Sequence, residues 1–485
     1  MKKNIFPKVL ASLSVVLVAA AMQAQTTDAT QPSTSNSKVR IVRLSQVKGD
    51  VQLDRKTGRG FENAMANLPI VEHSQLRTST GMAEIEFEDN STLRLTPDSL
   101  VEFPQLERLP TGATATSVEL QKGTAYISLL KTPGNQFTLL LGERKIDLQP
   151  ATHIRLQLDG TAAKLAVLDG TVRVDGPSGP VDVSKKKTVT FQTVFQDQPS
   201  VAKDIESSQF DDWDKDAAGY HSRVPSMSAF NNSPYAYGLS DMGYYGSFMN
   251  AGGCGSMWRP YFASMAWDPF SNGAWAWYPG AGYSWVSPYP WGWTPYHYGS
   301  WSYCDGTGWG WMPGGSWYGL NNVASLNPTG GSGGGITVPR PPGHTPHPGE
   351  PTVTAVNLKP LPQSEIGSAD KFVFRKDSAG MGVPRETLGN LDKLSRQAGS
   401  KGTASVQIYA VAPPNAGGRP TSYTQSMGTT IHRGSPPPAH RDDSYQNGSF
   451  GGSGGGSSSA GMSSSQSRPT AAPAAPSGPA SGGRR

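Results

Sequence analysis

From residue 38 to residue 192 the chain runs in short stretches of alternating apolar and polar residues, which turn-forming residues separate. Residues 83–87 read Ala-Glu-Ile-Glu-Phe, and residues 118–120 and 172–174 show the same period of two. This alternation is typical of β-strands that bury one face, and the region lacks the 3.6-residue period of an amphipathic helix. We therefore expect residues 38–192 to form one all-β domain.

Turn-forming residues recur between these stretches, in the sequences Lys48-Gly49-Asp50, Asp89-Asn90-Ser91, Lys122-Gly123-Thr124, Asp159-Gly160-Thr161 and Asp169-Gly170-Thr171. Tight hairpin turns place residues at positive φ, which glycine and asparagine adopt at little cost and β-branched residues resist. Each of the five sequences is therefore predicted to form a turn.

A different pattern extends from residue 243 to residue 320. Trp258-Arg-Pro-Tyr is followed about 35 residues later by Trp293-Thr-Pro-Tyr, and Trp275-Ala-Trp is followed about 34 residues later by Trp309-Gly-Trp. A repeat of this length indicates two copies of one supersecondary unit.

The repeated region is rich in tryptophan and poor in charge. All 12 tryptophans of the chain lie between Trp213 and Trp317. The charged residues of 243–320 are Arg259, Asp268 and Asp305. Each Trp-x-Trp pair places two indoles on one face of a strand, and Asn272-Gly273 and Asp305-Gly306 predict hairpin turns. We expect a small two-repeat β module whose indoles pack against one another or against a ligand.

The rest of the mature chain is predicted to be less regular. Its segments are a connector with a short helix (193–242), a Gly/Pro linker (321–352), a partly ordered segment (353–412) and a disordered tail rich in Ser, Gly, Pro and Ala (413–485). Phe210 and Trp213 share one face of the connector helix. The segment 353–412 has three short strand patterns and a helix pattern near residues 386–397. Because it has too little apolar surface to be stable alone, we expect it to dock onto a neighbour.

The first residues predict export. Lys2 and Lys3 precede a short apolar run over residues 9–21 and small residues suited to cleavage, as in a secretory signal peptide over residues 1–24, and a polar, disordered leader (25–37) follows. The alternative is an uncleaved signal anchor, but the run is shorter than the ~20 residues that cross a bilayer. No later segment is long and apolar enough, so no transmembrane helix is expected in the mature chain, which we place in the periplasm, on the outer surface or outside the cell.

Composition narrows the class further. The 485 residues include 57 glycines and 40 prolines, and only 36% of the residues are hydrophobic, which argues against one large compact globule. The net charge of +5 is a small surplus over this length, so we expect no nucleic-acid partner.

Five motifs occur in the order found in the FecR-type domain. They are Val42-Arg43-Leu44 with Gly49, Gln75-Leu76-Arg77-Thr78, residues 83–95, residues 118–123 and residues 167–174. Residues 38–192 thus resemble a FecR-type domain, with Pro150-Ala151-Thr152 where the family carries a Gly-Thr pair. The resemblance implies a β-domain of solenoid or sandwich type that acts as an extracytoplasmic interaction module.

The iron-signalling role of membrane-bound FecR-type sigma regulators is not expected to transfer. Those regulators carry a cytoplasmic helical segment, a transmembrane helix and a further signalling domain. This sequence instead has a signal peptide before the β-domain and an aromatic block after it.

The aromatic block also resembles a known family. Its Trp293-Thr-Pro-Tyr-His-Tyr-Gly-Ser-Trp301 string and its Gly308-Trp-Gly-Trp311 string, with the preceding Phe210-Asp-Asp-Trp213 and Leu239-Ser-Asp-Met242, resemble a Trp/Tyr-rich domain of unknown function. That domain often follows FecR-type domains in exported bacterial proteins. The resemblance implies no activity.

The two cysteines, Cys254 and Cys304, bracket most of the aromatic block. An even number of cysteines in an exported chain favours a disulfide between them. Two alternatives remain: Cys304 aligns with Phe270 of the other repeat and could be a small buried hydrophobe, or it could be a nucleophile with His297 as its base.

Other candidate chemistry is weak. His344-Thr345-Pro346-His347 has a spacing that suits a metal, but Pro346 disfavours the helix that would align the two histidines, so we favour a linker. Asp268 and Asp305 occupy turn positions rather than a paired acid and base. We expect no catalytic site, metal or cofactor.

We therefore expect an exported, non-enzymatic envelope protein that acts as an interaction or scaffolding module, with an envelope protein as its partner. The alternative is a protein that binds glycan or peptidoglycan on exposed aromatic platforms. Those platforms would be Tyr296, Tyr298, Trp301 and Trp311.

Overall fold

The computed structural model describes residues 39–194, 197–223, 235–326, 338–357, 373–375, 377–383, 385, 390–401 and 403–405. The predicted signal peptide, the leader and the tail from residue 413 lie outside these ranges, as do parts of the 353–412 segment. Within the described ranges, no helix is both long and apolar enough to cross a membrane.

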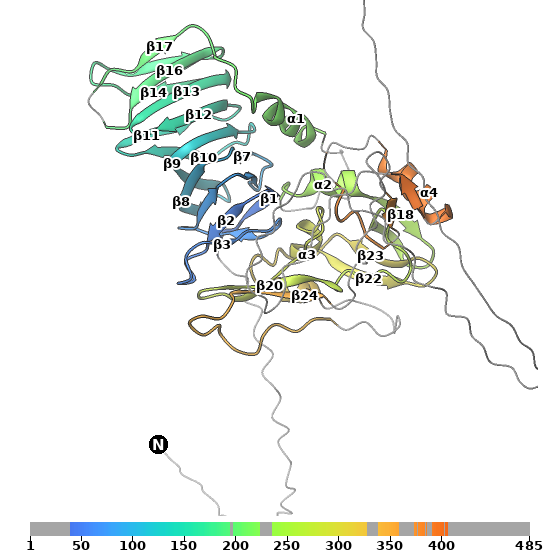
Figure 1. The fold of residues 1–485 in the computed structure, drawn as a ribbon. Helices are drawn as coiled ribbons and strands as arrows, with labels where there is room; N and C mark the ends of the chain where they lie inside the picture. The colour runs from blue at the N-terminus through green and yellow to red at the C-terminus, as the bar shows by residue number, and fades with distance from the viewer. Residues whose placement is uncertain are drawn as a thin grey trace, which may run out of the picture. The chain divides into compact units, whose positions relative to one another are not determined.

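The first part of the chain forms strands β1–β17, which we call the β-domain (Figure 1). The strands are β1 (Val42–Lys48), β2 (Val51–Asp54), β3 (Glu62–Asn63), β4 (Pro69–Ile70), β5 (Gln75–Thr78), β6 (Met82–Glu86), β7 (Thr92–Leu95), β8 (Ser99–Arg108), β9 (Thr114–Ser128), β10 (Gln136–Leu141), β11 (Arg144–Leu148), β12 (His153–Asp159), β13 (Ala162–Asp169), β14 (Thr171–Val174), β15 (Val181–Ser184), β16 (Lys187–Gln192) and β17 (Ser200–Ala202). Strands β14 and β15 form a separate ribbon, and the others form one 15-stranded sheet. The all-β prediction is confirmed.

The sheet has two arms that share β9. One arm runs β17-β16-β13-β12-β9-β7-β6-β1-β4, and the other joins β3-β2-β5-β8 and β10-β11 to the first half of β9. The predicted alternation is seen in β9, where Val118 and Leu120 are buried while Ser117 and Glu119 are partly exposed. The buried aliphatic side chains of both arms form a single core cluster.

Gly123 is the corner at which β9 changes arms. Residues 114–122 of β9 pair with β8, and residues 123–128 pair with β12 and β7. Gly123 has φ of +92°, and a Cβ there would lie 2.6 Å from the carbonyl oxygen of Asp98. The predicted Lys122-Gly123-Thr124 turn is therefore wrong, because this glycine bends one long strand instead of linking two. Asn90 and Gly160, both at positive φ, form the predicted hairpin turns between β6 and β7 and between β12 and β13. Gly49 and Gly170 also have positive φ, but they link strands that do not pair with each other.

A helix and an aromatic module follow the β-domain. The predicted connector helix is α1 (Asp211–His221), whose first turn carries three aspartates that favour the positive end of its dipole. The aromatic module, residues 235–326, contains α2 (Leu239–Tyr245), β18 (Gly246–Ala251), β19 (Gly255–Pro260), β20 (Asn272–Tyr278), β21 (Gly282–Val286), α3 (Thr294–His297), β22 (Ser300–Cys304), β23 (Gly308–Met312) and a 3₁₀ helix (Asn322–Leu326).

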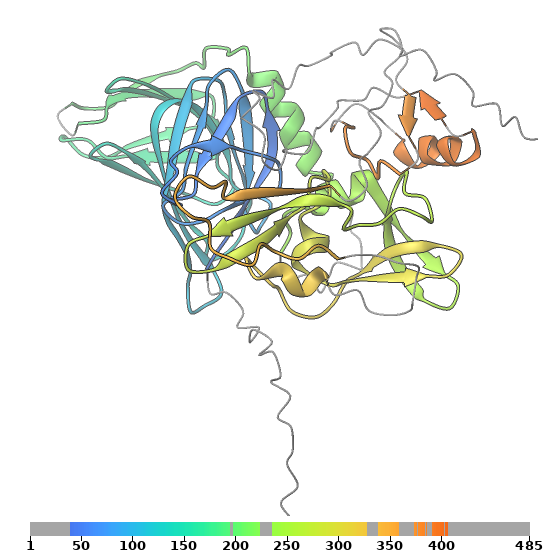
Figure 2. The ribbon, with the colours of Figure 1, turned by 60° about the horizontal axis from the view of Figure 1, so that its bottom comes forward.

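The segment after the predicted linker completes the aromatic module. β24 (Val353–Asn357) pairs with β20 and extends the β21-β20 hairpin to three strands, which lie side by side in Figure 2. α4 (Leu391–Lys401) buries Leu391 and Ala398 in the aromatic core, and β25 (Val373–Arg375) pairs with β26 (Thr403–Ser405). Among the described residues of the segment, β24 and α4 thus dock onto the aromatic module, as expected from its small apolar surface.

The two sequence repeats do not form two copies of one unit. Trp258 lies in strand β19, whereas its counterpart Trp293 immediately precedes helix α3. Asp305-Gly306 forms the predicted hairpin turn between β22 and β23, but Asn272-Gly273 lies inside β20. A Cβ at Gly273 would collide with the indole of Trp285 on the paired strand β21, so this glycine makes room for a ring instead of forming a turn.

The corner in β9 gives a direct test with a matched control. Gly112 has φ of +87°, close to that of Gly123, but open space around its Cβ position. We expect Gly112→Ala to cost about 1–2 kcal/mol of unfolding free energy for its backbone conformation. Gly123→Ala should cost about 1–3 kcal/mol more, because its methyl group meets backbone atoms. Urea unfolding of the purified variants measures the difference, and equal losses at the two positions would contradict the corner.

Candidate functional site

The predicted aromatic platform is part of the protein core. Tyr296, Trp301 and Trp311 are 0% exposed and Tyr298 is 3% exposed. The ring of Trp301 lies 5.7 Å from that of Trp267 and 5.8 Å from that of Tyr296 between centroids. The expectation of an exposed platform is therefore wrong, because the module has few aliphatic side chains and its rings supply the buried apolar area instead.

Cys254 and Cys304 form a disulfide with a Cα–Cα distance of 6.1 Å. It links the turn of the β18–β19 hairpin to the end of β22, so it ties together the two hairpins of the four-stranded sheet. Closing a loop of 50 residues adds about 4 kcal/mol in the chain-entropy model. Cys304 is thus neither a free hydrophobe nor a nucleophile in this structure.

His297, the base considered for Cys304, has a structural environment. It is 2% exposed, its Nδ1–H donates to the carbonyl oxygen of Gly319 at 2.8 Å, and its ring lies against Trp293 and Trp317. Burial lowers the pKa of His297 to about 4, so the ring is neutral at pH 7.

A cluster of buried charges was not foreseen from the sequence, and we call it the ionic network. Its members are Arg43 (β1), Glu84 and Glu86 (β6), Arg94 (β7), Asp214 and His221 (α1), Asp241 (α2) and Arg385. Each is more than nine-tenths buried. Charges in such a position must be paired, because desolvation costs several kcal/mol per ion.

The strand register provides half of the pairing. Arg43 lies opposite Glu86 in the β1–β6 pair, and Arg94 lies opposite Glu84 in the β6–β7 pair. The corresponding salt bridges measure 2.8 Å and 2.9 Å. In the sequence, these residues resemble the solvated face of half-buried strands. The cross-strand match of opposite charges is the signal that could have revealed them.

Glu84 is the centre of the network. Its carboxylate accepts hydrogen bonds from Arg94 Nε at 2.9 Å, from Ser45 Oγ at 2.6 Å and from Arg385 Nη1. His221 Nε2 lies 2.9 Å from the same carboxylate. Burial alone would raise the pKa of Glu84, but the charges of His221, Arg385 and Arg94 hold it well below its usual range.

His221 approaches with both ring nitrogens toward oxygen atoms. Asn90 Nδ2 donates to the carbonyl oxygen of His221 at 3.2 Å, which leaves Asn90 Oδ1 facing His221 Nδ1 at 3.0 Å. With Nε2 on Glu84, both ring nitrogens face oxygen atoms. The network thus places four carboxylates among three arginines and this histidine.

Asp241 carries the network into the aromatic module. Arg385 donates to both of its carboxylate oxygens, at 2.9 Å and 2.8 Å, and Tyr220 donates its hydroxyl at 2.7 Å. Arg43 lies 2.7 Å from the same carboxylate and also donates to the carbonyl oxygen of Pro290. Burial would raise the pKa of Asp241, but Arg385 and Arg43 lower it overall.

A second polar seam joins the β-domain to the aromatic module. Asn67 Nδ2 donates to the carbonyl oxygens of Ser287 and Tyr289, and the hydroxyl of Tyr278 donates to the carbonyl oxygen of Pro69 at 2.6 Å. Arg55 donates to the carbonyl oxygen of Trp277 at 2.7 Å. Apolar side chains of the module, among them Tyr237, Ala276, Tyr278 and Trp293, belong to the core cluster of the β-domain. The interface thus combines a shared apolar core with buried ion pairs and hydrogen bonds.

The ionic network predicts an uneven response to the loss of arginines. Arg385→Met removes a cation from two buried carboxylates, and we expect a loss of about 3–5 kcal/mol of unfolding free energy. Arg396→Met removes the exposed ion pair with Asp392 on α4 and should cost less than about 1 kcal/mol. Chemical unfolding of both variants measures this, and similar losses would contradict a stabilising network.

His297 predicts a pH dependence. Its pKa in the fold is about 4, below the ~6.5 of an unfolded chain, so its contribution is present above pH 6.5 and is lost as the pH falls. Between pH 7 and pH 5 we expect it to account for a loss of about 2 kcal/mol of unfolding free energy. In the His297→Asn variant, this loss of unfolding free energy between pH 7 and pH 5 should disappear. The His73→Asn variant, changed at an exposed position, should still show it. An unchanged pH profile in His297→Asn would refute the assignment.

Comparisons with known proteins agree with the two-part organisation. Residues 74–173 match the FecR protein family, and residues 238–325 match a family of unknown function, DUF6600. A search of curated proteins finds no significant match.

Among solved structures, two crystal structures of a candidate anti-sigma factor from Parabacteroides distasonis are similar to this chain. They are 12% and 13% identical to it, with TM-scores of 0.23 and 0.22. Each match covers 27% of this chain and 59% of the other, so this chain spans less than two thirds of the length of these relatives. By its family matches, the chain contains a FecR domain at residues 74–173, within the β-domain, followed by a DUF6600 domain at residues 238–325.

Proposed function

We propose that this chain is an exported, non-enzymatic scaffold of the cell envelope, in which the β-domain binds another envelope protein. The observation that carries this proposal is the interface between the β-domain and the aromatic module. Arg43 and Arg385 each bridge a β6 carboxylate and Asp241 of the module. An interface of this kind holds the two parts in a fixed relation, which suits a scaffold better than a hinged enzyme.

The disulfide and the N-terminal pattern support export. Structural disulfides persist in oxidising compartments and are rare in the cytosol. Cys254 and Cys304 are bonded, and the sequence before the β-domain has the charged and apolar regions of a signal peptide.

The environment of the titratable groups supports a non-enzymatic role. A general acid or base must meet its substrate, yet Glu84 and Asp241 are 0% exposed and bound by arginines. An open hollow of about 350 Å³ is lined by Tyr235 and Glu88. Salt bridges to Arg40 and Arg108, at 2.7 Å and 3.1 Å, hold the carboxylate of Glu88. The glycan alternative has lost its support, since its four platform rings are buried.

Site-specific photo-crosslinking in cells that produce the protein tests the proposal. Crosslinkers would replace Leu130, Lys122 and Val201 on the β-domain, and Met265 on the aromatic module, all at exposed positions. We expect a discrete adduct with an envelope protein from one or more β-domain positions and none from Met265. We also expect both cysteines to resist alkylation until they are reduced.

Two outcomes would overturn the proposal. One is a chain that fractionates with the cytoplasm and has freely alkylated cysteines. The other is a correctly exported, oxidised chain that yields no adduct from any of the three β-domain positions.

A further inference from the structure

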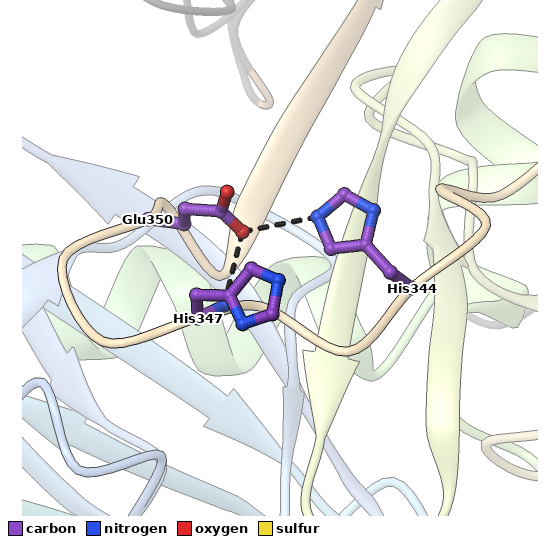
Figure 3. Close-up of side chains that lie close together, drawn as sticks. All are labelled: His344, His347 and Glu350. Atoms are coloured by element: carbon purple, nitrogen blue, oxygen red, sulfur yellow. Dashed lines mark hydrogen bonds and ion pairs between the residues drawn. The ribbon is translucent and has the colours of Figure 1, made fainter.

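Three potential metal ligands converge in the segment that precedes β24. His344, His347 and Glu350 lie in one turn, and Figure 3 shows their side chains gathered on the same side of it. His344 Nε2 is 3.0 Å from Glu350 Oε2, and one ligand atom from each of the three residues lies within 4.8 Å of the others. The two imidazole rings are 5.4 Å apart between centroids and nearly parallel.

The backbone of the turn brings these side chains together. Glu350 N–H donates to the carbonyl oxygen of His347 at 3.0 Å, and the N–H of His347 donates to Glu350 Oε2 at 2.9 Å. Gly349 has φ of +97°, a conformation that glycine supplies readily. Pro346 and Pro348 restrict the backbone further. Pro346 disfavours a helix that would align the two histidines, but the turn at residues 347–350 brings the three side chains together without one.

The ligand set suits a borderline-soft divalent ion. Two imidazoles and one carboxylate are the protein ligands of open zinc sites, whereas calcium and magnesium prefer oxygen ligands alone. The side chains of His344 and Glu350 are 56% and 44% exposed, so an ion can reach them from solvent.

We propose that His344, His347 and Glu350 bind one divalent transition-metal ion, with Zn²⁺ as the best fit. The ion takes two imidazole nitrogens and one carboxylate oxygen and leaves at least one position for water or for a ligand from a partner. Neither the FecR nor the DUF6600 match extends to these residues, so the site is independent of both families and of the proposed scaffold role.

The place of the site in the chain gives metal binding a structural consequence. Two residues after Glu350, the hydroxyl of Thr352 accepts a hydrogen bond from Arg55 and donates to Glu62 in the β-domain. β24 begins at the next residue and pairs with β20. A bound ion fixes the turn that leads into this junction, so it stabilises the folded chain by mass action.

Zinc titration of the metal-free full-length chain, without an affinity tag, tests the proposal. We expect isothermal titration calorimetry to show one site per chain and Co²⁺ to give visible d–d absorption on binding. Both signals should weaken at least tenfold in His344→Ala/His347→Ala and to a smaller extent in Glu350→Gln. Excess Mg²⁺ or Ca²⁺ should not compete.

Two controls separate this site from other histidines. His73→Ala removes an exposed histidine next to a single glutamate, and His432→Ala/His440→Ala removes the pair in the C-terminal tail. Both should bind zinc as the unmodified chain does, and in both zinc should raise the melting temperature, an effect absent from His344→Ala/His347→Ala. The proposal is overturned if the unmodified chain does not bind zinc, or if the tail variant loses binding while His344→Ala/His347→Ala keeps it.

Discussion

The burial of two glutamates on β6 is the constraint on which the rest of the structure depends. Glu84 and Glu86 are both 0% exposed, and an unpaired carboxylate in such a place would cost several kcal/mol. Neighbouring strands supply one arginine for each. The other partners of Glu84 are Ser45 on β1 and two residues that lie far away in the chain, His221 and Arg385. The charges on this face of the sheet are therefore fully compensated only when α1 and Arg385 are in place.

In the aromatic module, several buried indole N–H groups donate hydrogen bonds to backbone carbonyl oxygens. Trp258 donates to the carbonyl oxygen of Met242, Trp291 to that of Ala379, and Trp311 to that of Tyr298. Each bond fixes the orientation of a ring against a different segment, including one that lies beyond β24. Other rings of the core, such as Trp275 paired edge-on with Trp285, are held by packing. A core made of rings is thus given a specific arrangement by a few directed donors.

Local features were predictable from the sequence. The strands of the β-domain follow from alternation, most turns follow from Gly and Asn at positive φ, and α1 lies where Phe210 and Trp213 indicated a helix. The turn predictions failed at positions where a residue distant in the sequence determines the local structure. Gly123 and Gly273 have the appearance of turn residues, yet one makes room for Asp98 and Ser99 and the other for an indole.

The ionic network and the aromatic core were not predictable for the same physical reason. A period-two pattern states which residues share a face of a strand, but not whether that face meets water or another element. Glu84 and Glu86 alternate with Ala83 and Ile85 just as solvated glutamates would. Likewise, a Trp-x-Trp pair indicates that two indoles share a face of a strand, but not what covers that face. The sequence was compatible with other rings or with a ligand, and the structure shows other rings.

The ionic network makes the β-domain depend on a residue that lies far along the chain. Arg385 is separated from Glu84 by 301 residues and from Asp241 by 144, and it is bonded to both. Contacts of such separation form only after long loops have closed, which disfavours their early appearance in folding. Until Arg385 arrives, Glu84 lacks one of its cations and Asp241 retains only Arg43. Full charge compensation in the β-domain therefore requires a segment that lies after the aromatic module in sequence, so the two parts complete their folding together.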